Sequence, residues 1–203
     1  MQDSIIHIID DDSQLRNALA SLLRSVNLNS TPYASCIEFL ESRKPDMPSC
    51  LLLDVRLPGI SGLEFQSKLV AYGINIPVVF MTGYGDIQMS VQAMKAGAVD
   101  FLPKPFREQE LLDAVNSALD RDRARRQVNG DLSLIVGRYQ DLTERERQVM
   151  NLVTSGRLNK QAAYDLGLSV VTIKLHRAAV MRKMGAKTLA DLVKMSERLV
   201  GEV

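Results

Sequence analysis

Carboxylates directly follow two apolar runs of this 203-residue sequence. Asp10–Asp12 come after Ser4–Ile9, and Asp54 comes after Leu51–Leu53. Short apolar runs of this kind are typical of strands that are buried on both faces of a parallel sheet. Ligands of such sheets bind outside the carboxyl ends of the strands. Acidic side chains gathered there therefore predict a site for a hard divalent cation.

Polar residues follow two further apolar runs. Thr82 comes directly after Val78–Met81, and Lys104 lies two residues beyond Val99–Leu102. Each polar residue also has an ordinary structural interpretation, as a turn former, a helix cap or a solvated amine. Their joint occurrence in this order favours a functional site at one edge of the sheet, which would collect Asp10, Asp11, Asp54, Thr82 and Lys104.

The segments that would position these residues alternate between short strands and amphipathic helices from residue 4 to about residue 120. This alternation predicts βαβ units and a five-stranded parallel, doubly wound sheet of the flavodoxin-like α/β class. Capping boxes beginning at Ser35 and Ser61 open the second and third helices, and the fourth runs from near Asp86 to Gly97. The strands are expected near Ile5–Ile9, Ser30–Tyr33, Cys50–Leu53, Pro77–Met81 and Val99–Leu102.

Length and composition indicate a folded chain of two domains. The sequence is 46% apolar and 24% charged, and its length suits domains of about 120 and 60 residues. Cys36 and Cys50 have no metal-binding spacing and are expected to be reduced, buried thiols. No run reaches the ~18 apolar residues of a membrane span, and no export signal is visible at the start, so a cytoplasmic protein without a membrane partner is expected.

Charge divides the chain more sharply than the net value of +1 suggests. Residues 1–120 carry 9 basic and 15 acidic residues, whereas residues 141–203 carry 11 basic and 7 acidic ones. A basic second domain suits a polyanionic partner such as DNA, although this excess is also compatible with ordinary surface charge. Between them, residues 121–140 predict a charged linker, partly helical and ending near Asn129-Gly130, or alternatively disordered.

Residues 141–203 predict an all-α unit of four helices. A capping box begins at Thr143, a short helix spans Lys160–Leu166, and Gly167 and Ser169 provide a stop and a new cap. This spacing fits the tight turn of a helix-turn-helix, although other helical hairpins look similar. In the next helix, Val170–Met184, the apolar spacing buries Ile173, His176, Val180 and Met184 and turns Val171, Thr172, Lys174, Leu175 and Ala178 outward.

The first part of the chain resembles the receiver domains of two-component response regulators. The matching positions are Ile9-Asp10-Asp11, Leu53-Asp54, Thr82-Gly83 and Lys104-Pro105-Phe106, and the runs 81–86 and 93–101 are similar to the FixJ branch. Asp12 stands where Glu is common, and Tyr84 stands where the branch often has His. Neither departure removes a reactive group.

The second part resembles the LuxR-type DNA-binding domain that FixJ-type regulators carry. Leu142–Glu146 and Ser169–Arg177 match its two signatures, and Asn159-Lys160-Gln161 matches between them. In this arrangement Val171, Lys174 and Leu175 are expected to face the major groove, with Thr172 beside them. Residues expected to meet DNA phosphates are Lys160, Arg177 and Arg182.

The resemblance implies a phosphorylation-dependent transcription regulator that is not an enzyme. A sensor histidine kinase would supply the phosphoryl group, and Asp54 would accept it as a nucleophile. Mg²⁺ would be held by Asp11, Asp54 and the backbone carbonyl of Arg56, with Asp10 acting mainly through water.

Three further roles follow from the resemblance. Lys104 would pair with the phosphoryl oxygens, Thr82 would donate its hydroxyl to one of them, and Phe101 would turn inward as Thr82 moves. The Lys104-Pro105 bond is expected to be cis.

Partners follow from the same resemblance. Promoter DNA and a second copy of the chain are expected, with RNA polymerase as a further partner. The dimer would form on phosphorylation through the fourth helix, at Val91, Met94 or Lys95. Alternatively, the last helix, around Leu192 and Val193, would dimerise constitutively.

Two rival functions use the same residues. Asp10 and Asp12 also suit a phosphatase of the haloacid-dehalogenase type, which forms an aspartyl phosphate with Mg²⁺, but that function leaves Asp54 and the second domain unexplained. The other rival is a DNA-binding regulator that acts without phosphorylation.

Overall fold

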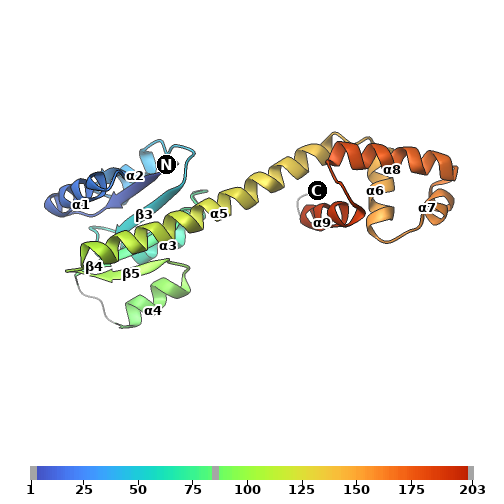
Figure 1. The fold of residues 1–203 in the computed structure, drawn as a ribbon. Coiled ribbons are helices and arrows are strands. Elements are labelled where there is room, and N and C mark those ends of the chain that lie inside the picture. Colours follow the sequence, from blue (N-terminus) through green and yellow to red (C-terminus); the bar gives the residue numbers. More distant parts are fainter. Residues whose placement is uncertain (1–3, 84–86, 201–203) are drawn as a thin grey trace. The chain divides into compact units, whose positions relative to one another are not determined.

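The computed structural model describes residues 4–83 and 87–200, which form two compact units divided between Arg126 and Gln127 (Figure 1). The expectations for Tyr84, for Asp86 as the start of a helix and for the first three residues lie outside the described residues. Among the helices described, none is long and apolar enough to cross a membrane.

The described part of the first unit is built on a five-stranded parallel sheet with the strand order β2-β1-β3-β4-β5. The fold class predicted from the sequence is therefore confirmed. The central strand β3 is buried along its whole length, as its leucine run predicted. The strands span Ile5–Ile9 (β1), Asn29–Tyr33 (β2), Ser49–Asp54 (β3), Val78–Thr82 (β4) and Asp100–Pro103 (β5).

Helices cover both faces of this sheet (Figure 1). α1 (Ser13–Ser25) and α5 (Glu108–Gln140) pack their leucine, alanine and valine side chains on one face. α2 (Cys36–Glu41), α3 (Gly62–Leu69) and α4 (Ile87–Lys95) pack on the other. Alternate residues of each strand supply the two cores, and the carboxyl ends of the strands remain for a site.

The helix α5 differs from its predicted course. It continues without a break to Gln140, past Asn129-Gly130, where the sequence predicted its end. A glycine inside a helix costs about 1 kcal/mol relative to alanine. This cost is offset by packing, because Ile135 is buried and Val136 and Tyr139 pack beside it in the core of the second unit.

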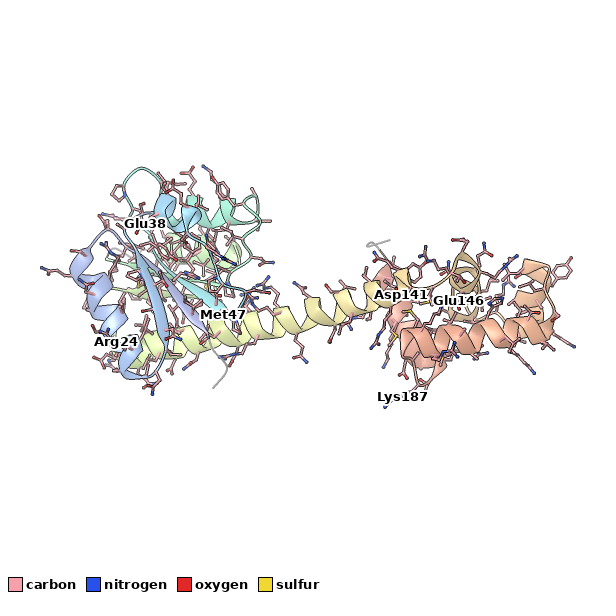
Figure 2. The ribbon with its side chains drawn as sticks, turned by 90° about the horizontal axis from the view of Figure 1, so that it is seen from above. Arg24, Glu38, Met47, Asp141, Glu146 and Lys187 are labelled. Carbon is pink, nitrogen blue, oxygen red and sulfur yellow. The ribbon has the colours of Figure 1, made fainter. Side chains whose placement is uncertain are left out.

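The second unit is helical, with a helix-turn-helix. Its helices after α5 are α6 (Glu144–Thr154), α7 (Asn159–Leu166), α8 (Val170–Met184) and α9 (Leu189–Leu199). The predicted capping box at Thr143 is present. Glu146 of this box, labelled in Figure 2, also accepts from Lys183 of α8 at 2.7 Å. One residue therefore caps α6 and ties it to α8.

The two cysteines are free and buried, as expected. Burial raises the pKa of the Cys36 thiol to about 11 and raises that of Cys50 further. The negative charge of Asp122 adds to the effect at Cys50. Neither thiol forms the reactive thiolate at neutral pH.

Candidate functional site

Three carboxylates meet at the carboxyl ends of β1 and β3. These strands pair with Ile9 opposite Leu53, so the residues that follow are brought together. Asp10 is fully buried, Asp54 is nearly so, and Asp11 is exposed. One oxygen from each of the three lies within 4.8 Å of the others. The predicted acidic cluster is therefore present in the fold.

Lys104 joins two of these carboxylates. Its Nζ donates to Asp10 Oδ2 at 2.7 Å and to Asp54 Oδ2 at 3.1 Å. The lysine follows β5 and precedes Pro105, and the peptide bond between them is cis, as the resemblance implied. Its backbone N–H donates to the carbonyl of Thr82 at 2.6 Å, which fixes the start of this loop to the end of β4.

The pKa of Asp54 is shifted upward by burial and by the charge of Asp10, and downward by Lys104. The net shift of this pKa is upward. For Lys104, burial lowers the pKa, but the bonds to Asp10 and Asp54 outweigh burial and leave it above its usual value. The ammonium is thus held in its charged form. An additional cation near Asp54 would favour the ionised, nucleophilic carboxylate.

The donor set fits Mg²⁺. Three carboxylates converge with one ammonium, which leaves excess negative charge, and hard oxygen ligands are those that Mg²⁺ prefers. Asp12 does not belong to this set. Its side chain caps α1 by accepting from the N–H groups of Gln14 at 2.8 Å and Leu15 at 3.3 Å.

The remaining predicted receiver residues lie around this cluster. Thr82 is fully buried at the end of β4, and Phe101 of β5 is partly buried with its ring centroid 6.4 Å from that of Phe80. The N–H of Arg56 donates to Asp54 Oδ1 at 3.3 Å. Thr82 thus ends a strand beside this cluster, whereas Phe101 lies opposite Phe80, before the ends of the strands.

A tight turn joins the two helices of the helix-turn-helix. Gly167 ends α7 in the left-handed conformation, with φ 63°, which glycine adopts without strain. Ser169 then caps α8 by accepting from the N–H of Thr172 at 3.0 Å. Both end signals predicted from the sequence are confirmed.

Most of the residues predicted to contact DNA are exposed. Val171 and Leu175 of α8 are 67% and 68% exposed, an unusual state for apolar side chains, with Lys174 exposed between them. Lys160 at the start of α7 and Arg182 near the end of α8 are also exposed. The exposed residues of α8 thus form a face that is aliphatic and basic, and Lys160 adds a further basic residue from α7.

Three residues of α8 lie differently from the prediction. His176 is only partly buried, although it was placed in the buried stripe. Thr172 is partly buried because its hydroxyl shares a 2.8 Å hydrogen bond with that of Ser169 at the helix cap. Arg177 is partly buried because it donates to Asn159 of α7 at 3.1 Å. Thr172 and Arg177 thus contribute to the geometry of the motif itself.

Two protein families match the two units. The family described as response regulator receiver domain matches residues 6–116, and the family described as bacterial regulatory proteins, luxR family, matches residues 140–196. The chain belongs to the response regulators. The resemblance stated from the sequence motifs is therefore confirmed.

Similar response regulators span nearly the whole chain. Nodulation protein W of Bradyrhizobium diazoefficiens is 50% identical over 196 residues, which cover 97% of this chain and 86% of that protein. The transcriptional regulatory protein FixJ of Rhizobium meliloti is 41% identical, over 97% of this chain and 96% of its own. The structure of the response regulator StyR superposes with a TM-score of 0.85 at 43% identity, covering 97% and 99% of the two chains.

Two residues of this response regulator were not singled out from the sequence. Asp122 is fully buried, although its neighbourhood is a charged stretch, and Gly62 lies against the backbone of Asp54. The sequence predicted that this charged stretch belongs to a linker. The local pattern carried no sign that Asp122 would be buried, because its burial depends on Ser49 at the start of β3.

Proposed function

We propose that this response regulator is a transcription regulator whose DNA binding is controlled by phosphorylation of Asp54, with a sensor histidine kinase as the phosphoryl donor. The observation that carries the proposal is the buried Asp54 carboxylate at the end of β3, joined through Lys104 to Asp10. A nucleophile with a fixed ammonium beside it is suited to receive an anionic group.

The reaction uses one oxygen of Asp54. This oxygen attacks the phosphorus, the bond between phosphorus and the kinase histidine nitrogen breaks, and the product is an acyl phosphate on Asp54 with a free histidine. Lys104, which already bonds to Asp54 Oδ2, pairs with the phosphoryl oxygens, and Thr82 donates its hydroxyl to one of them. Phe101 then turns inward toward the space next to Thr82.

Mg²⁺ would be held by Asp11, Asp54 and the carbonyl of Arg56, with Asp10 acting through water. It would supply positive charge to neutralise the phosphoryl oxygens. The protein itself contributes the positions of the three carboxylates. β1 and β3 bring Asp10, Asp11 and Asp54 together, and the 3.3 Å bond from the Arg56 N–H orients the Asp54 carboxylate.

The second unit reads promoter DNA in this proposal. The exposed residues of α8, Val171, Lys174 and Leu175, meet base edges with Thr172 beside them, while Lys160, Arg177 and Arg182 meet phosphates. Residues 1–120 act as the receiver, 121–140 as the linker and 141–203 as the DNA-binding domain. RNA polymerase at the promoter is the next partner, and the site of action is the cytoplasm.

Phosphorylation acts through a dimer of receivers. The face of α4 carries exposed Val91, Met94 and Lys95, and α4 follows the strand that ends at Thr82. A two-fold contact there would link the phosphoryl site to dimer formation. The alternative contact around Leu192 and Val193 of α9 is less well supported, because Leu192 is fully buried in the core of its own unit and Val193 is partly buried.

The phosphatase alternative is less well supported by the geometry. It requires the carboxylates of Asp10 and Asp12 as a reactive pair, whereas Asp12 is engaged as the cap of α1. A regulator that acts without phosphorylation could keep Lys104 only to neutralise two buried acids, so the labelling test separates this rival from the proposal.

The test is labelling with acetyl phosphate and Mg²⁺, followed by peptide mass spectrometry. We expect one phosphoryl group per chain, on Asp54, none on the Asp54→Asn variant, and normal labelling of the control Asp113→Asn on the exposed side of α5. Equal labelling of Asp54→Asn would refute the proposal. Steady release of phosphate from a phosphate monoester would instead favour the phosphatase.

A further inference from the structure

Gly62 makes an unusually close approach to the backbone of Asp54. It is the first residue of α3 and is buried, and its N–H donates to the carbonyl of Val55 at 2.9 Å. A Cβ atom at position 62 would lie 2.3 Å from the carbonyl oxygen of Asp54, and 3.1 Å from both the Asp54 carbonyl carbon and the Val55 Cα. All three neighbours are backbone atoms, so they have no rotamer by which to move away.

Local conformation does not explain the glycine. Gly62 is absent from the residues with positive φ, so alanine could adopt its backbone angles. Gly62 is the first residue of α3, where helix formation does not call for glycine, and inside helices alanine is the better residue. The requirement for glycine at position 62 therefore comes from the approach to Asp54.

We propose that Gly62 is a positioning residue for the phosphorylation of Asp54, an inference that rests on the proposed function of that aspartate. The main chain of Asp54 is held on one side by β4, where the N–H of Val55 donates to Met81 at 3.0 Å. The start of α3 rests against the same peptide. Because position 62 carries no side chain, the loop after β3 can return this closely and hold Asp54 at a set distance from Asp10 and Lys104.

A methyl group at position 62 would displace Asp54 or α3. To reach ordinary van der Waals separation, the added Cβ and the Asp54 carbonyl must move apart by about 1 Å. Errors of this size in placing a reacting group reduce rates by about 100-fold. We therefore expect the maximal rate of Asp54 phosphorylation in Gly62→Ala to fall by about 100-fold, with little change in the half-saturating acetyl phosphate concentration.

The experiment uses the full chain, acetyl phosphate and Mg²⁺. Gly130→Ala and Gly137→Ala serve as matched controls, because both glycines lie inside α5 with no atom within 4 Å of an added Cβ. Amide hydrogen exchange over residues 54–62 is measured on the same proteins without phosphodonor. We expect faster exchange at Arg56 and Gly62 in Gly62→Ala, and wild-type rates of labelling and exchange in both controls.

The outcomes separate this inference from the function on which it rests. Wild-type labelling and exchange in Gly62→Ala would overturn the positioning role. Failure of Gly62→Ala to fold would also overturn it, because the glycine would then serve stability and not position. If wild-type Asp54 takes up no label, the proposed function fails, and the exchange measurement still decides whether Gly62 positions Asp54.

Discussion

The carboxylate of Asp122 is joined to the main chain of Ser49, 73 residues earlier, by a 3.0 Å hydrogen bond from the Ser49 N–H to Asp122 Oδ2. Asp122 is fully buried, and Arg125 and Arg126 of the same helix complete its hydrogen bonds. Ser49 begins β3 and Asp54 ends it. One strand is therefore fixed to α5 at its first residue and carries Asp54, the proposed phosphoacceptor, at its last.

Asp122→Ala is expected to lower the free energy of unfolding of the receiver by about 2 kcal/mol, since the buried Ser49 N–H would lose its acceptor. Asp120→Ala is the matched control. Asp120 forms an exposed pair with Arg123 in the same stretch, and removing it should change the stability by less than about 0.5 kcal/mol. Calorimetry of the full chain measures both, and equal losses would contradict the role of burial.

Lys104→Met should reduce the rate of Asp54 labelling by acetyl phosphate by about 100-fold, the usual effect of removing one fixed electrostatic contact. The change leaves Asp10 and Asp54 facing each other without the intervening ammonium. Lys68→Met, which removes a surface pair with Glu64, is the control and should label normally. If both variants label at the same rate, the ammonium has no part in the transfer.

His7 should make the receiver less stable in mild acid. It is 1% exposed, Nδ1 lies 3.1 Å from the Tyr33 hydroxyl, and burial, with help from the charge of Lys44, lowers its pKa from 6.5 to about 4. Below pH 6.5 the unfolded chain binds a proton that the folded chain does not. Stability therefore falls from pH 6.5 to about 4, by up to about 3 kcal/mol.

The test of this pH dependence is His7→Leu, which has no proton to bind. Its receiver transition, followed by calorimetry, should depend less on pH between 6.5 and about 4 than that of the wild type. His176→Gln in the second unit serves as the control. An unchanged slope in His7→Leu would mean that other groups cause the loss.

Lys174→Ala and Lys160→Ala should affect DNA binding in different ways. Lys174 lies between the exposed Val171 and Leu175, so its loss should relax the preference among binding sites. Lys160 lies at the start of α7, and its loss should weaken all sites alike and reduce the slope of log affinity against log salt by about 1. Parallel losses on every sequence from both variants would contradict this division.

Val91→Asp should prevent dimerisation of the phosphorylated protein. A charge placed in an apolar contact on α4 would have to be buried without a partner, which strongly opposes association. Val70→Asp, at an even more exposed valine after α3, is the control and should leave the dimer intact. Sedimentation of both forms decides: a dimer that is equally stable with and without phosphate, and insensitive to Val91→Asp, excludes this mechanism.

Local sequence patterns predicted the sheet, because apolar runs such as Leu51–Leu53 admit few alternatives to a buried strand. The gathering of Asp10, Asp11 and Asp54 at one edge followed from parallel strand direction, and the structure adds that β1 and β3 are neighbours. Gly167 and Ser169 likewise located the turn of the helix-turn-helix through their own backbone chemistry.

Contacts between segments distant in sequence were not predictable in this way. The burial of Asp122 depends on Ser49, and the need for glycine at position 62 depends on the path of the loop after β3. The continuation of α5 past Gly130 depends on the packing of Ile135 in the core of the second unit. These features depend on tertiary packing, which local propensities do not encode.

Both thiols of the chain lie in the receiver, so a cysteine-modifying reagent would report the opening of this unit alone. Cys36 begins the six-residue helix α2, whereas Cys50 is fully enclosed in β3. Fraying of a short helix suffices to free the first thiol, but the second is freed only when the central strand separates from its neighbours. The rate of Cys36 modification therefore reports partial opening of the receiver, and the rate of Cys50 modification reports its complete unfolding.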